Sequence, residues 1–353
     1  MRVAVVSMDT VATRDAPAVR RTRRVAAGLA AAGHDVHWLC AQWWGGEIEH
    51  FEQDGIEYHA VTERPSSGRF RSKLPFVLRR VDPDVVHAVS VPPGHATTAK
   101  TTAAMLRVPV VLDWWERDPD RGSGRQYRKA ATRADRVIAP SETVRTAVRE
   151  HGASDVNARV IPESIDMDLV RSADADDRFD MVWGRDLDGD ANVGEFLLAL
   201  AELRDRDWTA AIVGDGPARD DAERMAADLR IDDRVRFLGD LDEAAFVPVL
   251  KGSHVFAQTA TYEPFATGLL WALACGCVGI VEYQAGSSAH ELVEGLDRGR
   301  LVTSPQELAD EIVACGSLPE WETNDGFAGF DHDEVRSEWV ECYEDAIEGH
   351  GWL

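Results

Sequence analysis

Residues 262–276 read YEPFATGLLWALACG and separate two short apolar runs. The first run, at 254–258, and the second, at 278–281, are each typical of a buried strand. Between them, a polar loop that carries Glu263 leads into an apolar helical segment ending at Gly276. The stretch therefore predicts a strand, a loop, a helix and a second strand. This order delivers a carboxylate and backbone amides to the edge where open α/β sheets bind ligands.

The composition bounds the class of protein. The chain has 353 residues, enough for two domains that each bury a core. A net charge of −24 and a pI near 4.8 argue against nucleic acid as a partner. Only four of the 38 basic residues are lysine. This acidic, lysine-poor composition predicts a halophilic protein that short carboxylates keep soluble in concentrated salt.

The charge differs between the two halves of the chain. Residues 1–170 carry a net charge of +2, whereas residues 171–353 carry −26. Such asymmetry suggests two domains with different roles.

The cysteines and the amino terminus indicate the compartment. The five cysteines show neither a metal-ligand pattern nor a disulfide framework: Cys40, Cys275, Cys277, Cys315 and Cys342. The first apolar run is too short for a signal peptide, and no run reaches the length of a membrane span. We therefore expect a protein of the reducing cytoplasm.

Residues 1–168 alternate between predicted strands and helices. A strand at 3–7, a helix at about 17–32 and a strand at 36–40 imply a parallel sheet with a crossover helix. Further strands are predicted at 85–88, 109–113 and 136–139, each followed by a helix. This part is expected to form the first domain.

The second half repeats the alternation. Strands are predicted to begin near 179, 210, 235, 254 and 278, and residues 178–330 are expected to form the second domain. The acidic segment 166–177 is predicted to be the linker, where an apolar core is not expected. A last amphipathic helix is predicted near 333–347, within a terminal segment 331–353.

The opening stretch also resembles the donor-site signature of the family 4 retaining glycosyltransferases. The matching residues are Glu263, Phe265, Ala272, Ala274, Cys275 and Gly276. Trp271 stands where the family has a second Glu, and Ala266 where it has Gly. The segments at 160–166 and 290–302 resemble the family as well, so the chain is identified as a divergent member.

The resemblance implies an α/β protein of GT-B fold. Two Rossmann-like domains would face each other across a cleft, and the carboxyl-terminal helix would cross back to the first domain. It also implies metal-independent transfer of a hexose, with retention, from a nucleotide-diphosphate sugar to a glycan, glycolipid or polyprenyl-linked acceptor. No cofactor is expected.

The resemblance assigns the donor sugar to the second domain. Arg185 matches the family's Gly-Arg position and would stabilise the diphosphate leaving group, while Glu263 would accept hydrogen bonds from sugar hydroxyls. The lysine that normally follows is absent, and Asp186, Asp188 and Asp190 fill that loop. The predicted donor-binding residues are Gly184, Arg185, Gly214, Gly216, Glu263, Phe265, Ala266, Thr267 and Trp271.

Each of these residues has a plainer interpretation. Arg185 could be a surface arginine that pairs with the acidic loop, and Glu263 could be a helix-capping carboxylate. Trp271 could stack on the nucleotide or fill core on its helix. The turn at 214–217 could be an ordinary tight turn, since such turns favour glycine.

Polar and aromatic residues near strand ends are predicted to form the acceptor side in the first domain. They are Asp9, Trp43, Trp44, His87, Asp113, Trp114, Trp115 and Glu116. His87 sits where the family often has a histidine near the reacting sugar, so it joins Arg185 and Glu263 as a predicted catalytic residue. A core or capping role is the alternative for His87, and a core role for the tryptophan pairs.

Residues 69–80 form a basic and apolar segment within this acidic protein. Arg69, Arg71, Lys73, Arg79 and Arg80 alternate with five large apolar residues. We hypothesise that the segment docks on the anionic inner face of a membrane and presents the first domain to a lipid-linked acceptor. A solvated helix that packs its Leu and Phe inward is the alternative.

Two other functions remain open at this point. The missing lysine, Trp271 and the acidic loop would also suit a transferase-derived scaffold or sugar-nucleotide binder that has lost turnover. Epimerisation of a nucleotide sugar is a third possibility, which the 263–276 stretch fits less well.

Overall fold

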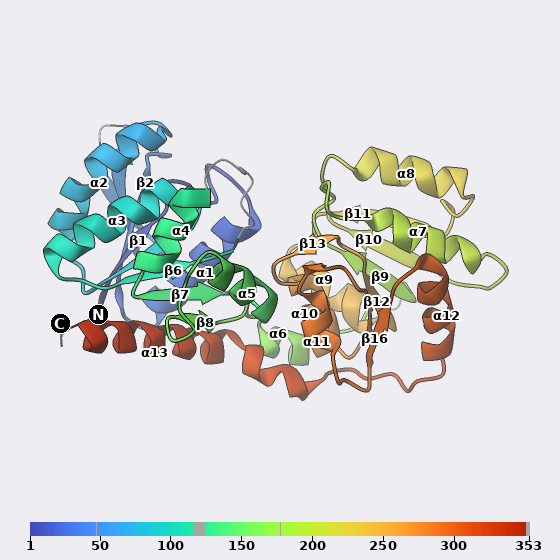
Figure 1. Cartoon of the computed structure of the whole chain (residues 1–353). Coiled ribbons are helices and arrows are strands. Elements are labelled where there is room, and N and C mark those ends of the chain that lie inside the picture. Colours follow the sequence, from blue (N-terminus) through green and yellow to red (C-terminus); the bar gives the residue numbers. More distant parts are fainter. Residues whose placement is uncertain (47, 116–123, 177, 351–353) are drawn as a thin grey trace. The chain divides into compact units, whose positions relative to one another are not determined.

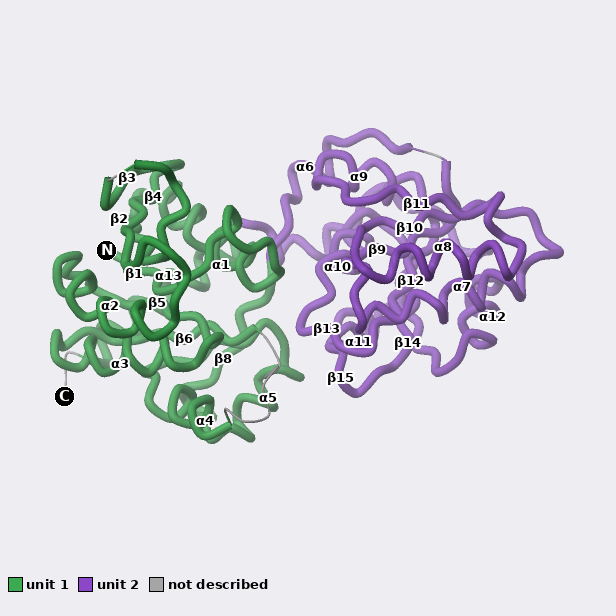
Figure 2. The backbone as a smooth tube through the Cα atoms, turned by 90° about the horizontal axis from the view of Figure 1, so that it is seen from above, with its two compact units in different colours: residues 1–163, 333–353 green, residues 164–332 purple. Residues whose placement is uncertain are grey.

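The computed structural model describes residues 1–46, 48–115, 124–176 and 178–350. The chain forms two compact units, residues 1–163 with 333–353, and residues 164–332 (Figure 2). Each unit contains a parallel sheet with helices, so the predicted α/β class is confirmed (Figure 1).

The first unit is built on a sheet whose strand order is β3-β4-β2-β1-β5-β6-β7-β8. All neighbouring strands are parallel except β3 and β4, which pair antiparallel. The strands are β1 (Arg2–Val6), β2 (Asp35–Ala41), β3 (His50–Gln53), β4 (Ile56–Thr62), β5 (Val85–Val89), β6 (Val110–Asp113), β7 (Arg136–Ala139) and β8 (Ala158–Val160). Strands alternate with helices along the chain because two parallel neighbours need a crossover connection between them.

Helices cover both faces of this sheet. The helices are α1 (Pro17–Ala31), α2 (Ser67–Val81), α3 (Pro93–Leu106), α4 (Gly124–Arg133) and α5 (Glu142–Glu150). Helices α2 to α5 bury their apolar side chains against one face, and α1 packs on the other. Ser141 caps α5, as its sequence position predicts, by accepting a hydrogen bond from the Val144 amide.

The carboxyl-terminal helix α13 (His332–His350) packs on the first unit, as predicted. It lies on the same face as α1, where Trp339 and Tyr343 join the core. The Tyr343 hydroxyl lies 2.7 Å from Nδ1 of His87, and Asp345 forms a 2.8 Å ion pair with Arg159. The carboxyl-terminal helix α13 therefore completes the core of the first unit.

The second unit is built on a parallel sheet of order β11-β10-β9-β12-β14-β16. Its strands are β9 (Met181–Gly184), β10 (Ala210–Val213), β11 (Val235–Gly239), β12 (Val255–Gln258), β14 (Val278–Glu282) and β16 (Gly299–Val302). A separate short pair joins β13 (Tyr262–Glu263) to β15 (Gly286–Ser287). The central strands are buried on both faces, which explains their continuous apolar runs.

The helices of the second unit lie on both faces of this sheet. They are α6 (Met167–Ser172), α7 (Val193–Glu202), α8 (Arg219–Asp228), α9 (Glu243–Lys251), α10 (Thr267–Ala274), α11 (Ala289–Val293) and α12 (Pro305–Cys315), with a 3₁₀ turn η1 (Asp325–Phe330). Helices α7, α8 and α12 share one apolar core. Helices α10 and α11 contact β14, and α10 also contacts α9.

The predicted linker differs from the structure. Residues 167–172 form α6, with Met167 and Val170 fully buried, so the expectation of no apolar core at 166–177 was wrong. Asp166 caps this helix by accepting a hydrogen bond from the Leu169 amide. The nearby aspartates masked the short apolar pattern, and Asp177 lies outside the described residues.

Arg21 is a cation buried in the core of the first unit. It projects from α1, is 2% exposed, and donates from Nε to both carboxylate oxygens of Asp113 at 3.1 Å. Its other nitrogens bond Glu163 at 3.0 Å and the carbonyl oxygen of Ile161 at 2.8 Å. One guanidinium thus connects α1, β6 and the segment after β8.

Aromatic rings enclose this ion cluster. The guanidinium carbon lies 5.4 Å from the Trp115 ring centre and 5.2 Å from that of Trp339, both within cation–π range. Burial lowers the pKa of Arg21, but the charges of Asp113 and Glu163 raise it more, so the net shift is upward. Burial also raises the pKa of Asp113, against the lowering effect of Arg21.

Replacing Arg21 tests how much this ion cluster contributes to the free energy of unfolding. Arg21→Met keeps the apolar stem but leaves Asp113 buried without its cation, while Glu163 keeps its ion pair with Arg24. We expect the free energy of unfolding to fall by about 3–5 kcal/mol, measured by urea denaturation. The control is Arg20→Met, which breaks the exposed pair with Asp15 and should cost less than about 1 kcal/mol. Equal losses in the two variants would contradict a central role for Arg21.

Candidate functional site

The loops after β9 and β10 approach each other closely in the second unit. Gly214 has φ +123°, and a Cβ atom there would lie 2.0 Å from the carbonyl oxygen of Arg185. A Cβ atom at Gly268, in the first turn of α10, would lie 2.5 Å from the carbonyl oxygen of Gly184. Only glycine fits these contacts without moving the backbone. The amino end of α10 is therefore held against the carboxyl end of β9.

Arg185 lies at this edge with its guanidinium fully engaged. Nη2 donates to both carboxylate oxygens of Asp188 at 2.9 Å, and Nη1 donates to the Tyr262 carbonyl oxygen at 3.0 Å. Nη1 also lies 3.1 Å from Oε2 of Glu263. Only 13% of the side chain is exposed. The cation is thus held rigidly, between two carboxylates.

Glu263 faces Arg185 from β13 and is 14% exposed at its side chain. Burial raises its pKa to about 7, and the charges of Asp188, Asp186 and Asp190 act in the same direction. Arg185 lowers the pKa, but by less than burial raises it. Near neutral pH this carboxyl group is therefore divided between its neutral and charged forms, and can donate as well as accept a hydrogen bond.

Another acidic side chain lies at the end of the neighbouring strand β14. Glu282 is 7% exposed and accepts hydrogen bonds from Gln284 at 2.9 Å and from Asn192 at 3.4 Å. Burial raises its pKa, with Glu195 adding to the shift. The carboxyl ends of β9, β12 and β14 thus gather one cation and several carboxyl groups.

The first unit holds a pocket at the carboxyl ends of its own strands. It is a small cleft that opens to solvent. Asp9, Arg14, Asp113 and Trp115 line it together with side chains from α1 and the segment at 89–91. Asp113 forms part of the floor and is bonded to Arg21 beneath. The pocket therefore combines carboxylates, a cation and an indole ring.

Two family models cover most of the chain. Residues 18–163 match the glycosyl transferase 4-like domain, and residues 173–320 match glycosyl transferases group 1. The chain belongs to the family 4 glycosyltransferases of GT-B fold.

Several known proteins resemble this glycosyltransferase. A glycosyltransferase from Rickettsia africae superposes with a TM-score of 0.80 at 14% identity and 98% coverage of both chains. HepE of Anabaena, solved with UDP, superposes at 0.74 with 20% identity over both whole chains. The 2-deoxystreptamine glucosyltransferase of Streptomyces kanamyceticus is 28% identical over 165 residues, 42% of this chain and 43% of that protein.

The predicted donor residues of this glycosyltransferase come together in part. Gly184, Arg185, Gly214, Gly216 and Glu263 surround the adjoining loops, and Arg185 contacts Glu263. Arg185 also pairs with Asp188 of the acidic loop, as its plainer interpretation expects, and its contact with a diphosphate stays a prediction. Thr267 is the first residue of α10. Phe265, Ala266 and Trp271 are buried, with 5%, 1% and 3% of their surfaces exposed. Trp271 therefore fills core, the second of its two predicted roles.

The predicted acceptor residues separate into three groups. Asp9, Asp113 and Trp115 line the pocket of the first unit. Trp43 and Trp44 pack in an aromatic cluster with Phe51. Trp114 and His87 are buried at 3% and 1% exposure, and Glu116 lies outside the described residues.

His87 has the contacts of a core residue in this structure. Its ring lies against Trp339, its Nδ1 bonds Tyr343, and its Nε2 lies 3.9 Å from Asp113. Burial lowers its pKa to about 3, with the charge of Arg21 adding to the shift. The ring is therefore neutral, and its contact with a sugar stays a prediction.

Three residues that form the contacts described above were not predicted from the sequence. Arg21 was one of many arginines on a predicted helix, and only the buried Asp113 explains it. Glu282 follows an apolar strand, a position that could have marked it as a site candidate. Tyr343 contacts His87 from a point 256 residues away in the chain, which no local pattern reveals.

The raised pKa of Glu263 makes stability depend on pH. Between its ordinary pKa of 4.5 and its folded value of about 7, the folded chain holds more protons than the unfolded chain, so stability falls as pH rises through this window. Glu263→Gln removes the effect. We expect its stability relative to the parent protein to rise by roughly 3 kcal/mol between pH 4 and pH 8.

Asp176→Asn is the control for this measurement. A hydrogen bond from Arg178 lowers the pKa of Asp176, so its contribution is lost only at more acidic pH. Denaturation at pH 5 and pH 8 should therefore give the same difference from the parent for this variant. A flat profile for Glu263→Gln as well would show that Glu263 ionises as an exposed carboxylate does.

Proposed function

We propose that this chain transfers a hexose from a nucleotide-diphosphate sugar to a hydroxyl group of a glycan, glycolipid or polyprenyl-linked acceptor, with retention at the anomeric carbon. The observation that carries the proposal is the pairing of Arg185 with Glu263 at the carboxyl edge of the second sheet. This edge is where parallel α/β sheets bind nucleotides.

The diphosphate would lie against Arg185 and the amino end of α10. Ala266 precedes that helix and has no side-chain oxygen to cap it. The Thr267 amide donates to the Phe265 carbonyl oxygen, so the amides that follow it in the first turn are the ones that would donate to a phosphate oxygen. Gly268 brings these amides next to the end of β9. One guanidinium and one helix end together supply positive potential without a metal ion.

Transfer would break the bond between the anomeric carbon and the phosphate oxygen. The departing nucleoside diphosphate keeps the electron pair, and Arg185 stabilises its charge. The acceptor hydroxyl forms the new bond to the anomeric carbon, and its proton passes to the leaving phosphate oxygen. Glu263 would hold sugar hydroxyls and so orient the ring for this step.

The acceptor would bind in the pocket of the first unit. Asp9 and Asp113 offer carboxylate oxygens to sugar hydroxyls, and Trp115 offers an indole at the wall. His87 remains a proposed positioning residue for the sugar, although its ring lies beneath α13 in this structure.

A second function, nucleotide-sugar binding without turnover, has one specific observation in its favour. Asp188 and Glu263 already neutralise Arg185, so a diphosphate must displace one carboxylate or bind as Glu263 takes up a proton. The same electrostatics predict weaker diphosphate binding as pH rises through about 7. The experiment therefore measures nucleotide binding and sugar transfer separately.

Charge changes around Arg185 test donor binding. UDP is the probe, because HepE was solved with it. We expect Arg185→Gln to weaken UDP binding about tenfold to a hundredfold in calorimetry, as loss of a charged hydrogen bond predicts. Asp188→Asn keeps the shape of the loop, frees Nη2, and should strengthen binding about threefold to tenfold.

The control is Arg224→Gln, which removes an exposed arginine on α8 that pairs with Asp221. It should leave UDP affinity unchanged. Release of glucose from UDP-glucose then separates the two functions, since binding with release supports transfer and binding without release supports the second function. Equal UDP affinity in the parent and Arg185→Gln would reject the donor site itself.

We further propose that helix α2 docks on an anionic membrane at the cytoplasmic inner face. Phe70, Leu74 and Leu78 pack inward as the alternative interpretation expects, but Phe76 is 76% exposed. The five basic side chains of the segment, Arg69, Arg71, Lys73, Arg79 and Arg80, are exposed as well. Among the described residues, no helix has the length and apolar character to cross a bilayer. Adaptation to concentrated salt stays a prediction alongside this one.

Cosedimentation with vesicles tests this docking. Each basic residue near an anionic surface contributes about 1 kcal/mol, so Arg79→Glu with Arg80→Glu should lower binding to phosphatidylserine vesicles at least about tenfold. The matched control is Arg224→Glu with Arg230→Glu, two exposed arginines of the second unit. Failure of the parent protein to cosediment, or equal losses in both double variants, would reject the docking surface.

A further inference from the structure

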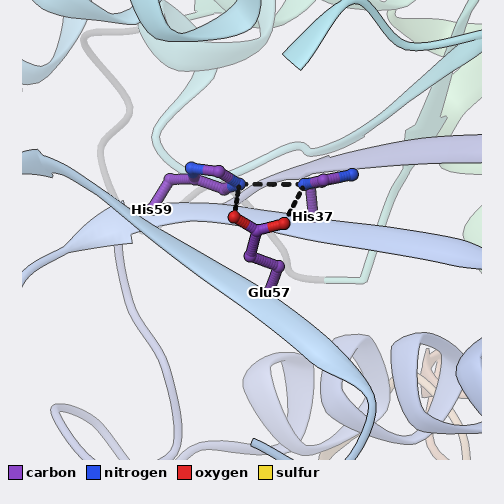
Figure 3. Close-up of side chains that lie close together, drawn as sticks. All are labelled: His37, Glu57 and His59. Atoms are coloured by element: carbon purple, nitrogen blue, oxygen red, sulfur yellow. Dashed lines mark hydrogen bonds and ion pairs between the residues drawn. The ribbon is translucent and has the colours of Figure 1, made fainter. Parts of the chain in front are cut away.

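Two histidines and a glutamate converge at the β3–β4 end of the first sheet (Figure 3). Nδ1 of His37 lies 2.9 Å from Nε2 of His59. Oε2 of Glu57 lies 3.3 Å from the first nitrogen, and Oε1 lies 3.6 Å from the second. The two imidazole nitrogens thus lie side by side, and each faces one carboxylate oxygen of Glu57.

Strand register produces this convergence. In the parallel pairing of β2 with β4, His37 stands opposite Glu57 and Leu39 stands opposite His59. Alternate residues of a strand share a face, so the three polar side chains project together. The antiparallel pairing of β3 with β4 adds His50 opposite His59 on that face. Three strands therefore meet at the cluster.

The spacing of these atoms suits a zinc site. Tetrahedral zinc with nitrogen ligands at 2.0–2.1 Å separates neighbouring ligand atoms by about 3.3 Å. The separation of the two nitrogens and the separation of each nitrogen from its nearer Glu57 oxygen lie on either side of this value. Nδ1 of His50 already lies 3.1 Å from Oε1 of Glu57, so a fourth ligand stands next to the cluster.

The surroundings of the side chains also suit a metal, because the rings of His37 and His59 are mostly buried, at 10% and 12% exposure. Behind His37, Oδ1 of Asp35 lies 3.0 Å from Nε2 without the geometry of a hydrogen bond, and Nδ1 faces the cluster. A carboxylate behind a histidine is the usual support of a metal ligand.

The neighbouring cations are occupied elsewhere. Arg2 pairs with Asp35 at 2.6 Å, and Arg80 pairs with Glu49 at 3.2 Å. The carboxylate of Glu57 thus faces the two imidazole rings.

We propose that His37, Glu57 and His59 bind one divalent transition-metal ion, zinc by its spacing, with His50 or water as the fourth ligand. The ion links β2 to β4, and through His50 to the edge strand β3. Imidazole and carboxylate ligands suit zinc and its neighbours in the first transition row better than magnesium or calcium.

The proposed ion is structural and plays no part in glycosyl transfer. His37 is the third residue of β2, whereas the pocket with Asp9 and Asp113 lies at the carboxyl ends of the strands. The five cysteines are buried and free, so their thiols do not compete for the ion in the folded chain.

Calorimetry with zinc chloride tests the site in full-length protein without a histidine tag, after dialysis against a chelator. We expect one ion per chain. His59→Ala and His37→Ala should each weaken binding at least about tenfold, and Asp35→Asn should weaken it about tenfold to a hundredfold while both rings stay in place. His350→Ala, which removes a histidine near Asp135, is the matched control and should bind as the parent does.

Cobalt substitution gives a second readout. Four-coordinate Co²⁺ absorbs visible light much more strongly than six-coordinate Co²⁺, so the parent and His350→Ala should give the intense spectrum and His59→Ala the weak one. Urea denaturation reports whether the first unit of each variant is folded, because UDP affinity would report only on the second unit. Zinc binding that is absent from the parent, or equal in the parent, Asp35→Asn and His59→Ala, overturns the proposal.

Discussion

The first unit depends on one buried guanidinium. Arg21 bonds Asp113 at the end of β6 and Glu163 after β8, while Trp115 and Trp339 enclose it. A buried charge is stable only with such partners, so the positions of these segments are mutually determined. Asp113 lines the pocket from above the same contact. The pocket and the return of α13 to the core thus rest on one ion cluster.

The second unit places its cation at a sheet edge instead of in the core. Arg185 is held by Asp188, Glu263 and a carbonyl oxygen, and the raised pKa of Glu263 reflects the excess of carboxylates there. Two glycines allow the backbone approach that brings these groups together. Arg185 is thus held in a fixed position, but Asp188 and Glu263 nearly neutralise its positive charge before any ligand binds.

Local patterns predicted the strands well. Strands at 136–139 and 210–213 have the bounds that their apolar runs indicate, because strands buried on both faces are continuous apolar segments. The edge strand β3 reads HFEQ and carries no such signal. The sequence of helix α6 indicates a linker instead of a helix, because its apolar residues are few and aspartates surround them. The family signature predicted Arg185 and Glu263 as donor-site residues, whereas their direct ion pair and the bonds of Arg185 to Asp188 are known only from the loop geometry.

By itself, the sequence determined the α/β class and the family, because these are written in short contiguous runs, and it predicted Arg185 and Glu263 as donor-site residues. Tertiary structure decided the partners of Arg21, the burial of His87 and Trp271, and the meeting of His37, Glu57 and His59. These contacts depend on strand register and on how helices dock. Neither is encoded within any one segment, since each arises from the packing of segments far apart in the chain.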